Sequence, residues 1–156
     1  MRILTILLLN FLTHLTHACD VDGVDGIQQW DRNSSMVIQN LISSNGRDCH
    51  EQWVGLIHHK DQNVRTMVAS TVSEQKILPE LSIPALVAKF SQANGEEGAI
   101  YYEAVAKFGK QAENDVMNAL KSESWLVRTR ACDALMIIRN AKDMNQRQLC
   151  KILNYG

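Results

Sequence analysis

Residues 61–72 read Asp-Gln-Asn-Val-Arg-Thr-Met-Val-Ala-Ser-Thr-Val, and part of this pattern recurs sixty-three positions later. The matching positions are Val64, Arg65, Thr66, Val68 and Val72 in the first copy and Val127, Arg128, Thr129, Ala131 and Leu135 in the second. The last two positions of each copy are four residues apart, which places both side chains on one face of a helix. The stretch therefore predicts an amphipathic helix that is used twice.

A shorter apolar stretch and a polar turn precede each copy, so the repeated unit is a pair of helices. The preceding apolar residues are Trp53, Val54 and Ile57 for the first copy and Val116, Met117 and Leu120 for the second. A middle pair fits between them, with Leu86, Val87 and Phe90 on one helix and Ile100, Ala104 and Phe108 on the other. One pair cannot bury its apolar stripe alone, so such hairpins must stack.

The predicted fold is therefore all-α, a short α-solenoid of stacked helical hairpins. We expect hairpins near residues 48–75, 83–108 and 112–139, and a final helix near 144–153. The composition agrees, because eight Gly and two Pro are too few for many short strands joined by turns.

Sixteen Lys and Arg against seventeen Asp and Glu give a net charge of -1, which is too balanced for a protein that neutralises many phosphates. Nucleic acid is not expected as the main partner.

The N-terminus has the form of a secretory signal peptide. Arg2 precedes an apolar run over residues 3–12, and Ala18 is a small residue suited to cleavage. The run is too short to span a bilayer of about 30 Å, and we see no later run long enough for a membrane span. We expect a signal peptide over 1–18 and one mature domain over 19–156, which opens with a polar lead-in over 19–35. In the alternative, a lipoprotein, Cys19 is the lipidated first residue.

All four cysteines follow the expected cleavage site. They are Cys19, Cys49, Cys132 and Cys150. An even count in an oxidising compartment predicts two disulfides, for which three pairings exist. We favour Cys19 with Cys49, which would pin the N-terminal segment, and Cys132 with Cys150, which would tie the last two helices together. The alternative for Cys132 is a buried free thiol.

The sequence contains no pattern that predicts a catalytic centre, a cofactor site or a metal site. The mature histidines are His50, His58 and His59, and adjacent histidines point about 100° apart on a helix, which prevents them from sharing a metal easily. The acidic stretch 20–26 lacks the ligand positions of a calcium-binding EF-hand loop. A serine-hydrolase elbow, a phosphate-binding glycine loop and the H-E-x-x-H pattern are all missing. We therefore expect a protein that is not an enzyme.

Two turns at the same end of neighbouring hairpins form the candidate partner-binding surface. The residues are Asn94, Gly95, Glu96, Glu97 and Gly98 in the middle hairpin and Ser122, Glu123, Ser124 and Trp125 in the next. The first set is predicted as the most flexible and most acidic loop of the repeats, and loop tips between rigid helices often bind partners. Trp125 either covers the core or anchors an interface. The arginines Arg65, Arg128 and Arg130 either pack between helices or form an alternative binding face.

The pattern Asp61-x-x-Val64-Arg65, echoed in Val127-Arg128, resembles the short variants of the HEAT repeat and the related armadillo-like repeats. The resemblance covers residues 48–156 and implies a right-handed superhelix that binds other proteins along a concave face or at its loops. Two departures stand out. Ser124 replaces the expected Asp in the last copy, and Tyr101 stands where the other copies have Arg.

The size, export and helical architecture also resemble the immunity proteins that bacteria carry against type VI secretion amidase effectors, which cut peptidoglycan. That resemblance implies an inhibitor in the periplasm that occludes the amidase's Cys-His cleft with a loop and forms a homodimer. The alternative is a periplasmic or lipid-anchored scaffold that assembles an envelope complex. A third interpretation is a secreted effector delivered to a host.

Overall fold

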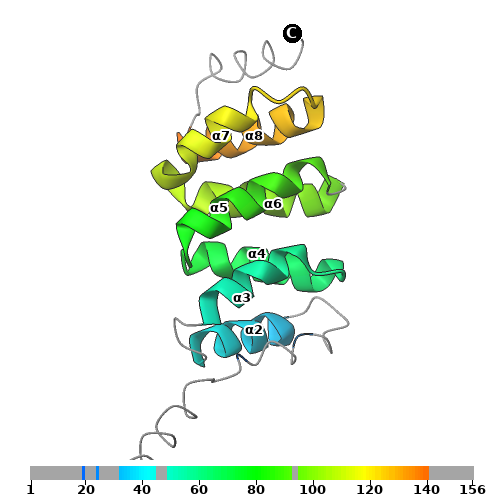
Figure 1. The fold of residues 1–156 in the computed structure, drawn as a ribbon, viewed down its shortest axis with the longest axis vertical. Helices are drawn as coiled ribbons and strands as arrows, with labels where there is room; N and C mark the ends of the chain where they lie inside the picture. Colours follow the sequence, from blue (N-terminus) through cyan, green and yellow to red (C-terminus); the bar gives the residue numbers. More distant parts are fainter. Residues whose placement is uncertain (1–18, 20–23, 25–31, 45–48, 93–94, 141–156) are drawn as a thin grey trace, which may run out of the picture.

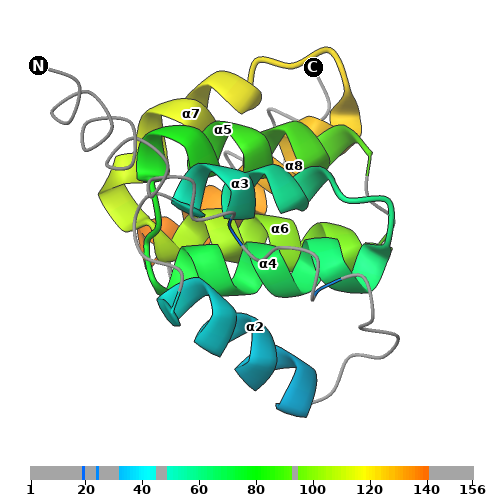
Figure 2. The same ribbon diagram turned by 60° about the horizontal axis from the view of Figure 1, so that its bottom comes forward.

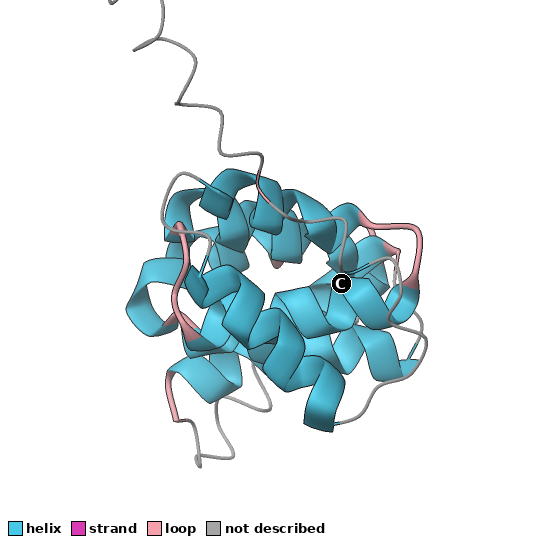
Figure 3. Ribbon diagram, turned by 90° about the horizontal axis from the view of Figure 1, so that it is seen from below, coloured by secondary structure: helices cyan, strands magenta, loops and turns pink. Residues whose placement is uncertain are grey.

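The computed structural model describes residues 19, 24, 32–44, 49–92 and 95–140. Seven α-helices lie in these ranges: α2 (Arg32–Ser44), α3 (His50–Gly55), α4 (Gln62–Glu74), α5 (Pro79–Ala88), α6 (Gly95–Lys107), α7 (Glu113–Ala119) and α8 (Trp125–Ile138). Short 3-10 turns follow three of them, at Leu56–His58, Lys89–Ser91 and Gly109–Ala112. Figure 3 shows only helices and loops among the described residues, so the all-α prediction is confirmed.

The helices stack in two layers (Figure 1, Figure 2). In one layer α2, α4, α6 and α8 contact one another in that order, and in the other layer α3, α5 and α7 do so. The hairpins are α3–α4, α5–α6 and α7–α8, and this packing is compatible with the expected solenoid. The expected signal peptide over 1–18, most of the lead-in over 19–35 and the final helix near 144–153 lie outside the described residues.

The middle hairpin begins earlier than the expected residue 83. Helix α5 starts at Pro79, and the residue before it, Leu78, has a left-handed backbone with φ 37°. Proline suits the first position of a helix, because its missing N–H would have no intrahelical acceptor there and its ring already fixes a helical φ. The proline therefore fixes the start of α5 four residues before the apolar pattern becomes regular.

The core runs between the two layers as one cluster from Ile38 in α2 to Leu135 in α8. The positions that echo across sixty-three residues, Val68 and Val72 in α4 and Ala131 and Leu135 in α8, are all buried. The largest fully buried side chains are Trp53, Tyr101, Phe90 and Phe108. The four-residue spacing therefore identified the core face of both helices.

A disulfide joins Cys19 to Cys49, with an S–S distance of 2.04 Å and a Cα–Cα distance of 5.5 Å. This confirms the pairing favoured for these two residues. Cys132 in α8 is buried and also disulfide-bonded, which rules out the free-thiol alternative. Its expected partner, Cys150, lies outside the described residues.

None of the described helices combines the length and the apolar character needed to cross a membrane.

Candidate functional site

The turns that join the two helices of each hairpin lie along one edge of the stack, on the right of Figure 1. We name this edge the rim, formed by the turns 58–61, 89–92 and 120–124 and by the first helical turn after each. An arginine of the following helix holds the first and the third turn, and an arginine of α8 holds the second.

Arg65 in α4 and Arg128 in α8 fix the first and third turns in the same way. Each arginine reaches back from the fourth residue of its helix, and its Nη1 donates to two carbonyl oxygens of the preceding turn. The acceptors are His59, at 2.9 Å, and Lys60, at 2.7 Å, for Arg65, and Ser122, at 2.9 Å, and Glu123, at 2.8 Å, for Arg128. Charge-assisted bonds of this kind satisfy turn carbonyls that have no helical partner. The repeated arginine is thus a turn-holding residue.

The two copies differ in how their second helices begin. Asp61 caps α4 by accepting a hydrogen bond from the backbone N–H of Asn63 at 2.7 Å. Ser124 stands at the equivalent position before α8 and makes no side-chain cap bond. The replacement of the Asp of the first copy by Ser124 in the last copy therefore leaves α8 without the side-chain cap that α4 has, an interaction worth about 1 kcal/mol.

The middle hairpin has no arginine of its own at this place. Helix α6 begins at Gly95, so Gly98, and not Tyr101, occupies the position of Arg65 and Arg128. The expected alignment of Tyr101 with the arginines is therefore wrong. Tyr101 is buried one turn further along α6, because the helix starts inside the stretch that was expected to be a loop.

Arg130 from α8 supplies the missing contact to the middle turn. Its Nη1 donates to the carbonyl oxygen of Phe90 at 2.5 Å, and its side chain is 5% exposed. The guanidinium lies against Gly98, where an added Cβ would come within 2.2 Å of Nη2. Gly98 therefore provides the space that lets an arginine of the third hairpin hold the turn of the second.

The acidic loop predicted at residues 94–98 is wrong for the part that the structure describes. Gly95, Glu96, Glu97 and Gly98 form the first turn of α6, whereas Asn94 lies outside the described residues. Acidic residues are favourable in a first helical turn, because they face the positive end of the helix dipole. Glu96 is exposed at the rim, but Glu97 is only 5% exposed.

Glu97 is held by partners from two helices. Its Oε1 accepts from Arg65 Nε at 2.9 Å, from Arg65 Nη2 at 2.8 Å and from the hydroxyl of Tyr101 at 2.8 Å. Burial, together with the hydrogen bond to Glu97, raises the pKa of Tyr101, so the phenol stays protonated and donates. Glu97 therefore joins the first hairpin to the second instead of facing a partner.

Trp125 is the most exposed large apolar side chain among the described residues, with 66% of its surface in solvent. It is the first residue of α8 and directly follows the turn residues Ser122, Glu123 and Ser124. Glu123 and Ser124 are also exposed, and Ser122 is partly so. Of the two alternatives for Trp125, coverage of the core is therefore wrong.

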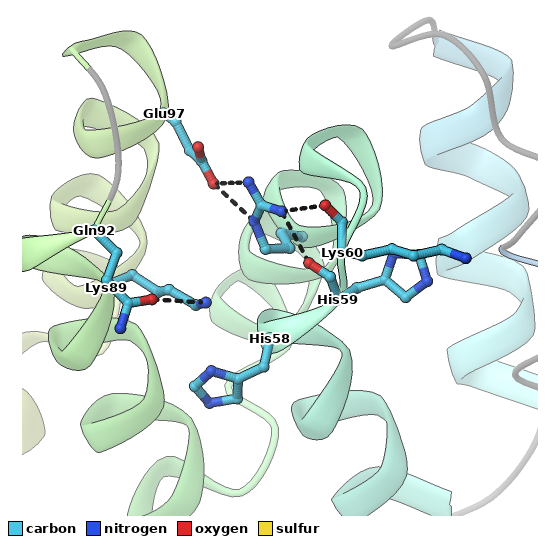
Figure 4. Close-up of a pocket in the computed structure, with 7 residues that line it drawn as sticks. His58, His59, Lys60, Lys89, Gln92 and Glu97 are labelled. Atoms are coloured by element: carbon cyan, nitrogen blue, oxygen red, sulfur yellow. Dashed lines mark hydrogen bonds and ion pairs between the residues drawn. The ribbon is translucent and has the colours of Figure 1, made fainter.

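A pocket of about 320 Å³ opens on the rim between the first and second turns (Figure 4). Its lining includes His58, His59, Lys60, Arg65, Lys89 and Glu97. The sequence did not predict this pocket, because the expected binding surface lay on the second and third turns and the histidines were considered only as metal ligands. The signal that could have revealed it is the run His58-His59-Lys60 in the turn equivalent to Ser122-Glu123.

Basic side chains in the pocket lie close enough to change one another's pKa. Loss of solvation and then the positive charge of Lys89 lower the pKa of His58, so these two groups influence each other across the pocket. Burial, followed by the charge of Arg65, lowers the pKa of Lys89, and Glu97 opposes this shift. The first part of the rim is therefore basic, whereas the third turn presents Glu123 and an indole.

Within the part of the chain that the structure describes, no three His, Cys, Asp or Glu side chains are grouped to hold a metal ion. Comparison with known proteins finds no matching family model, no matching curated protein and no matching solved structure.

Proposed function

We propose that this chain is a HEAT-like protein-binding module without enzymatic activity, which engages one protein partner through its rim. The observation that carries the proposal is the exposure of Trp125 on a turn that Arg128 holds in place. Tryptophan is among the residues that most often anchor protein interfaces. A turn that is already fixed also loses little conformational entropy on binding.

The proposed compartment is the bacterial periplasm. The signal-peptide pattern of residues 1–18 supports export, and the Cys19–Cys49 disulfide supports it independently, because disulfides persist in oxidising compartments. The proposed partner is a peptidoglycan amidase of the type VI secretion effectors, which the chain would inhibit by occluding the active-site cleft. Since Glu97 is buried, the part of the rim proposed to enter the cleft is the third turn with Trp125.

The test is peptidoglycan hydrolysis by an amidase effector encoded beside the gene, measured with increasing amounts of the exported chain. We expect inhibition by the parent and a loss of inhibitory strength of at least about tenfold in Trp125→Ala, as for an interface anchor. Leu81→Ala is the matched control, because Leu81 is also an exposed apolar residue but lies in the first turn of α5, away from the rim. It should inhibit as the parent does.

Other outcomes separate the alternatives. Equal inhibition by Trp125→Ala and the parent would contradict the rim as the binding surface. If the amidase is not inhibited and the chain instead forms a stable complex with an envelope protein that Trp125→Ala disrupts, the scaffold function replaces the immunity function.

A further inference from the structure

The pocket between the first and second turns contains a lysine in an unusual setting. Lys89 is 7% exposed, and its Nζ makes a long hydrogen bond of 3.4 Å to Oε1 of Gln92. An ammonium group has three hydrogens to donate, and lysines are almost never this buried unless they are paired. In Figure 4 the Nζ of Lys89 extends into the pocket, toward the side that carries His58. The ammonium therefore has donor capacity directed at the cavity.

The other charged groups of the pocket offset the charge of Lys89 only in part. Glu97 is the one acidic side chain in the lining, and it accepts from Nε and Nη2 of Arg65, so its negative charge acts on Arg65 as well as on Lys89. Beyond Arg65 and Glu97, the charge directed at the pocket is that of Lys89, because in Figure 4 the side chains of His59 and Lys60 extend away from it. The excess charge of the pocket is positive.

We infer that this pocket binds a small oxyanion between the Nζ of Lys89 and the imidazole of His58. A volume of about 320 Å³ lies at the lower end of the range for ligand pockets, which suits one compact group and not an extended molecule. A phosphate-type or sulfate-type dianion and a carboxylate share the required chemistry, oxygen acceptors with negative charge. This site is separate from Trp125 and goes beyond the proposed protein-binding function, so either can fail without the other.

The test is a nuclear magnetic resonance titration of the full chain as purified, in which the imidazole signals of His58 and His59 are followed at fixed pH. Sodium sulfate and sodium acetate are added in separate series, with sodium chloride at equal ionic strength as the reference. We expect a saturable shift of the His58 signals with an oxyanion and not with chloride. Saturation by sulfate alone identifies a dianion site, and saturation by acetate identifies a carboxylate site.

Lys89→Gln should weaken the saturable binding at least tenfold. Lys110→Gln is the control, because Lys110 is an exposed lysine in the 3-10 turn after α6 and does not line the pocket. His58→Asn is a second variant at an exposed position, and Lys89 amine signals report binding in that variant. Shifts that match chloride in size, or unchanged affinity in both Lys89→Gln and His58→Asn, would overturn the inference.

Discussion

The first and third turns of the rim are built alike and present opposite chemistry. Arg65 and Arg128 hold them with the same pair of bonds to turn carbonyls. Yet the first turn presents His58, His59 and Lys60, and the third presents Ser122 and Glu123 followed by Trp125. The residues that recur are those that maintain the fold, and the residues that face solvent are free to differ. In this chain, binding chemistry is therefore expected at the positions that break the repeat.

The largest effect should come from the carboxylate that ties the first turn to the second hairpin. Glu97→Lys places a positive charge beside Arg65 in a buried site, and breaking a buried pair costs about 3–5 kcal/mol. Glu96→Lys, one residue away but exposed, should change the free energy of unfolding by less than about 0.5 kcal/mol. Urea denaturation of both variants measures the difference. Similar stabilities of the Glu97→Lys and Glu96→Lys variants would contradict the burial of Glu97.

The next largest effect on stability should come from Leu135, the core residue of the third hairpin that corresponds to Val72 in the first. Leu135→Ala should lower the free energy of unfolding by roughly 2–5 kcal/mol, because it removes a buried side chain and leaves a cavity. Ile137→Ala on the same helix is the control, since Ile137 is 50% exposed and should cost far less. The same denaturation experiment applies. A loss below about 1 kcal/mol at Leu135 would contradict the assignment of the core face.

The two turn-holding arginines should not be equal in strength. Arg65→Ala removes the turn bonds and also the ion pair with buried Glu97, whereas Arg128→Ala removes the turn bonds of the third hairpin. We expect a cost of about 2–3 kcal/mol for Arg65 and about 1 kcal/mol for Arg128. Adding Glu97→Gln to Arg65→Ala should cost less than the sum of the single changes, because the two residues act as a pair. If the effects of the two substitutions on the free energy of unfolding simply add, Arg65 and Glu97 do not stabilise the fold as a pair.

The smallest effect is a loss of stability at alkaline pH, which we expect from Tyr101 in the second hairpin. The native pKa of Tyr101 is raised above its ordinary value of 10.0, so the unfolded state loses this proton first as pH rises. Fewer protons bound in the unfolded state mean that stability falls with increasing pH above about 10 and is unaffected below it. Thermal unfolding of the parent and of Tyr101→Phe between pH 8 and 11 measures this. The parent should lose stability more steeply, and parallel curves would contradict the assignment.

The echo at sixty-three residues predicted the helical class and the buried positions Val68, Val72, Ala131 and Leu135, because hydrophobic spacing reports burial directly. The start of α6 was missed, since two glycines and two glutamates over residues 95–98 have the composition of a loop. Two of the side chains that contact this stretch, Arg65 and Arg130, are distant in the chain.

The candidate site was predicted least well for the same reason. Glu97 meets an arginine 32 positions earlier, and Gly98 is small because Arg130 occupies the adjacent space. The basic pocket combines residues 58–60 of one hairpin with Lys89 and Gln92 of the next. The exposed third turn, Ser122 to Trp125, lies at the start of α8 and was located from local sequence.

The bonds that cross between hairpins have a consequence for how the array opens. In a repeat protein each unit can unfold separately unless the interfaces between units are strong compared with the units themselves. Arg65 of the first hairpin bonds to Glu97 of the second, and Arg130 of the third hairpin bonds to the turn of the second. The middle hairpin is therefore bonded to both of its neighbours through side chains. Opening of the second hairpin alone would break both ties. The three units should therefore exchange their buried amide hydrogens as one cooperative block, with the middle hairpin no less protected than its neighbours.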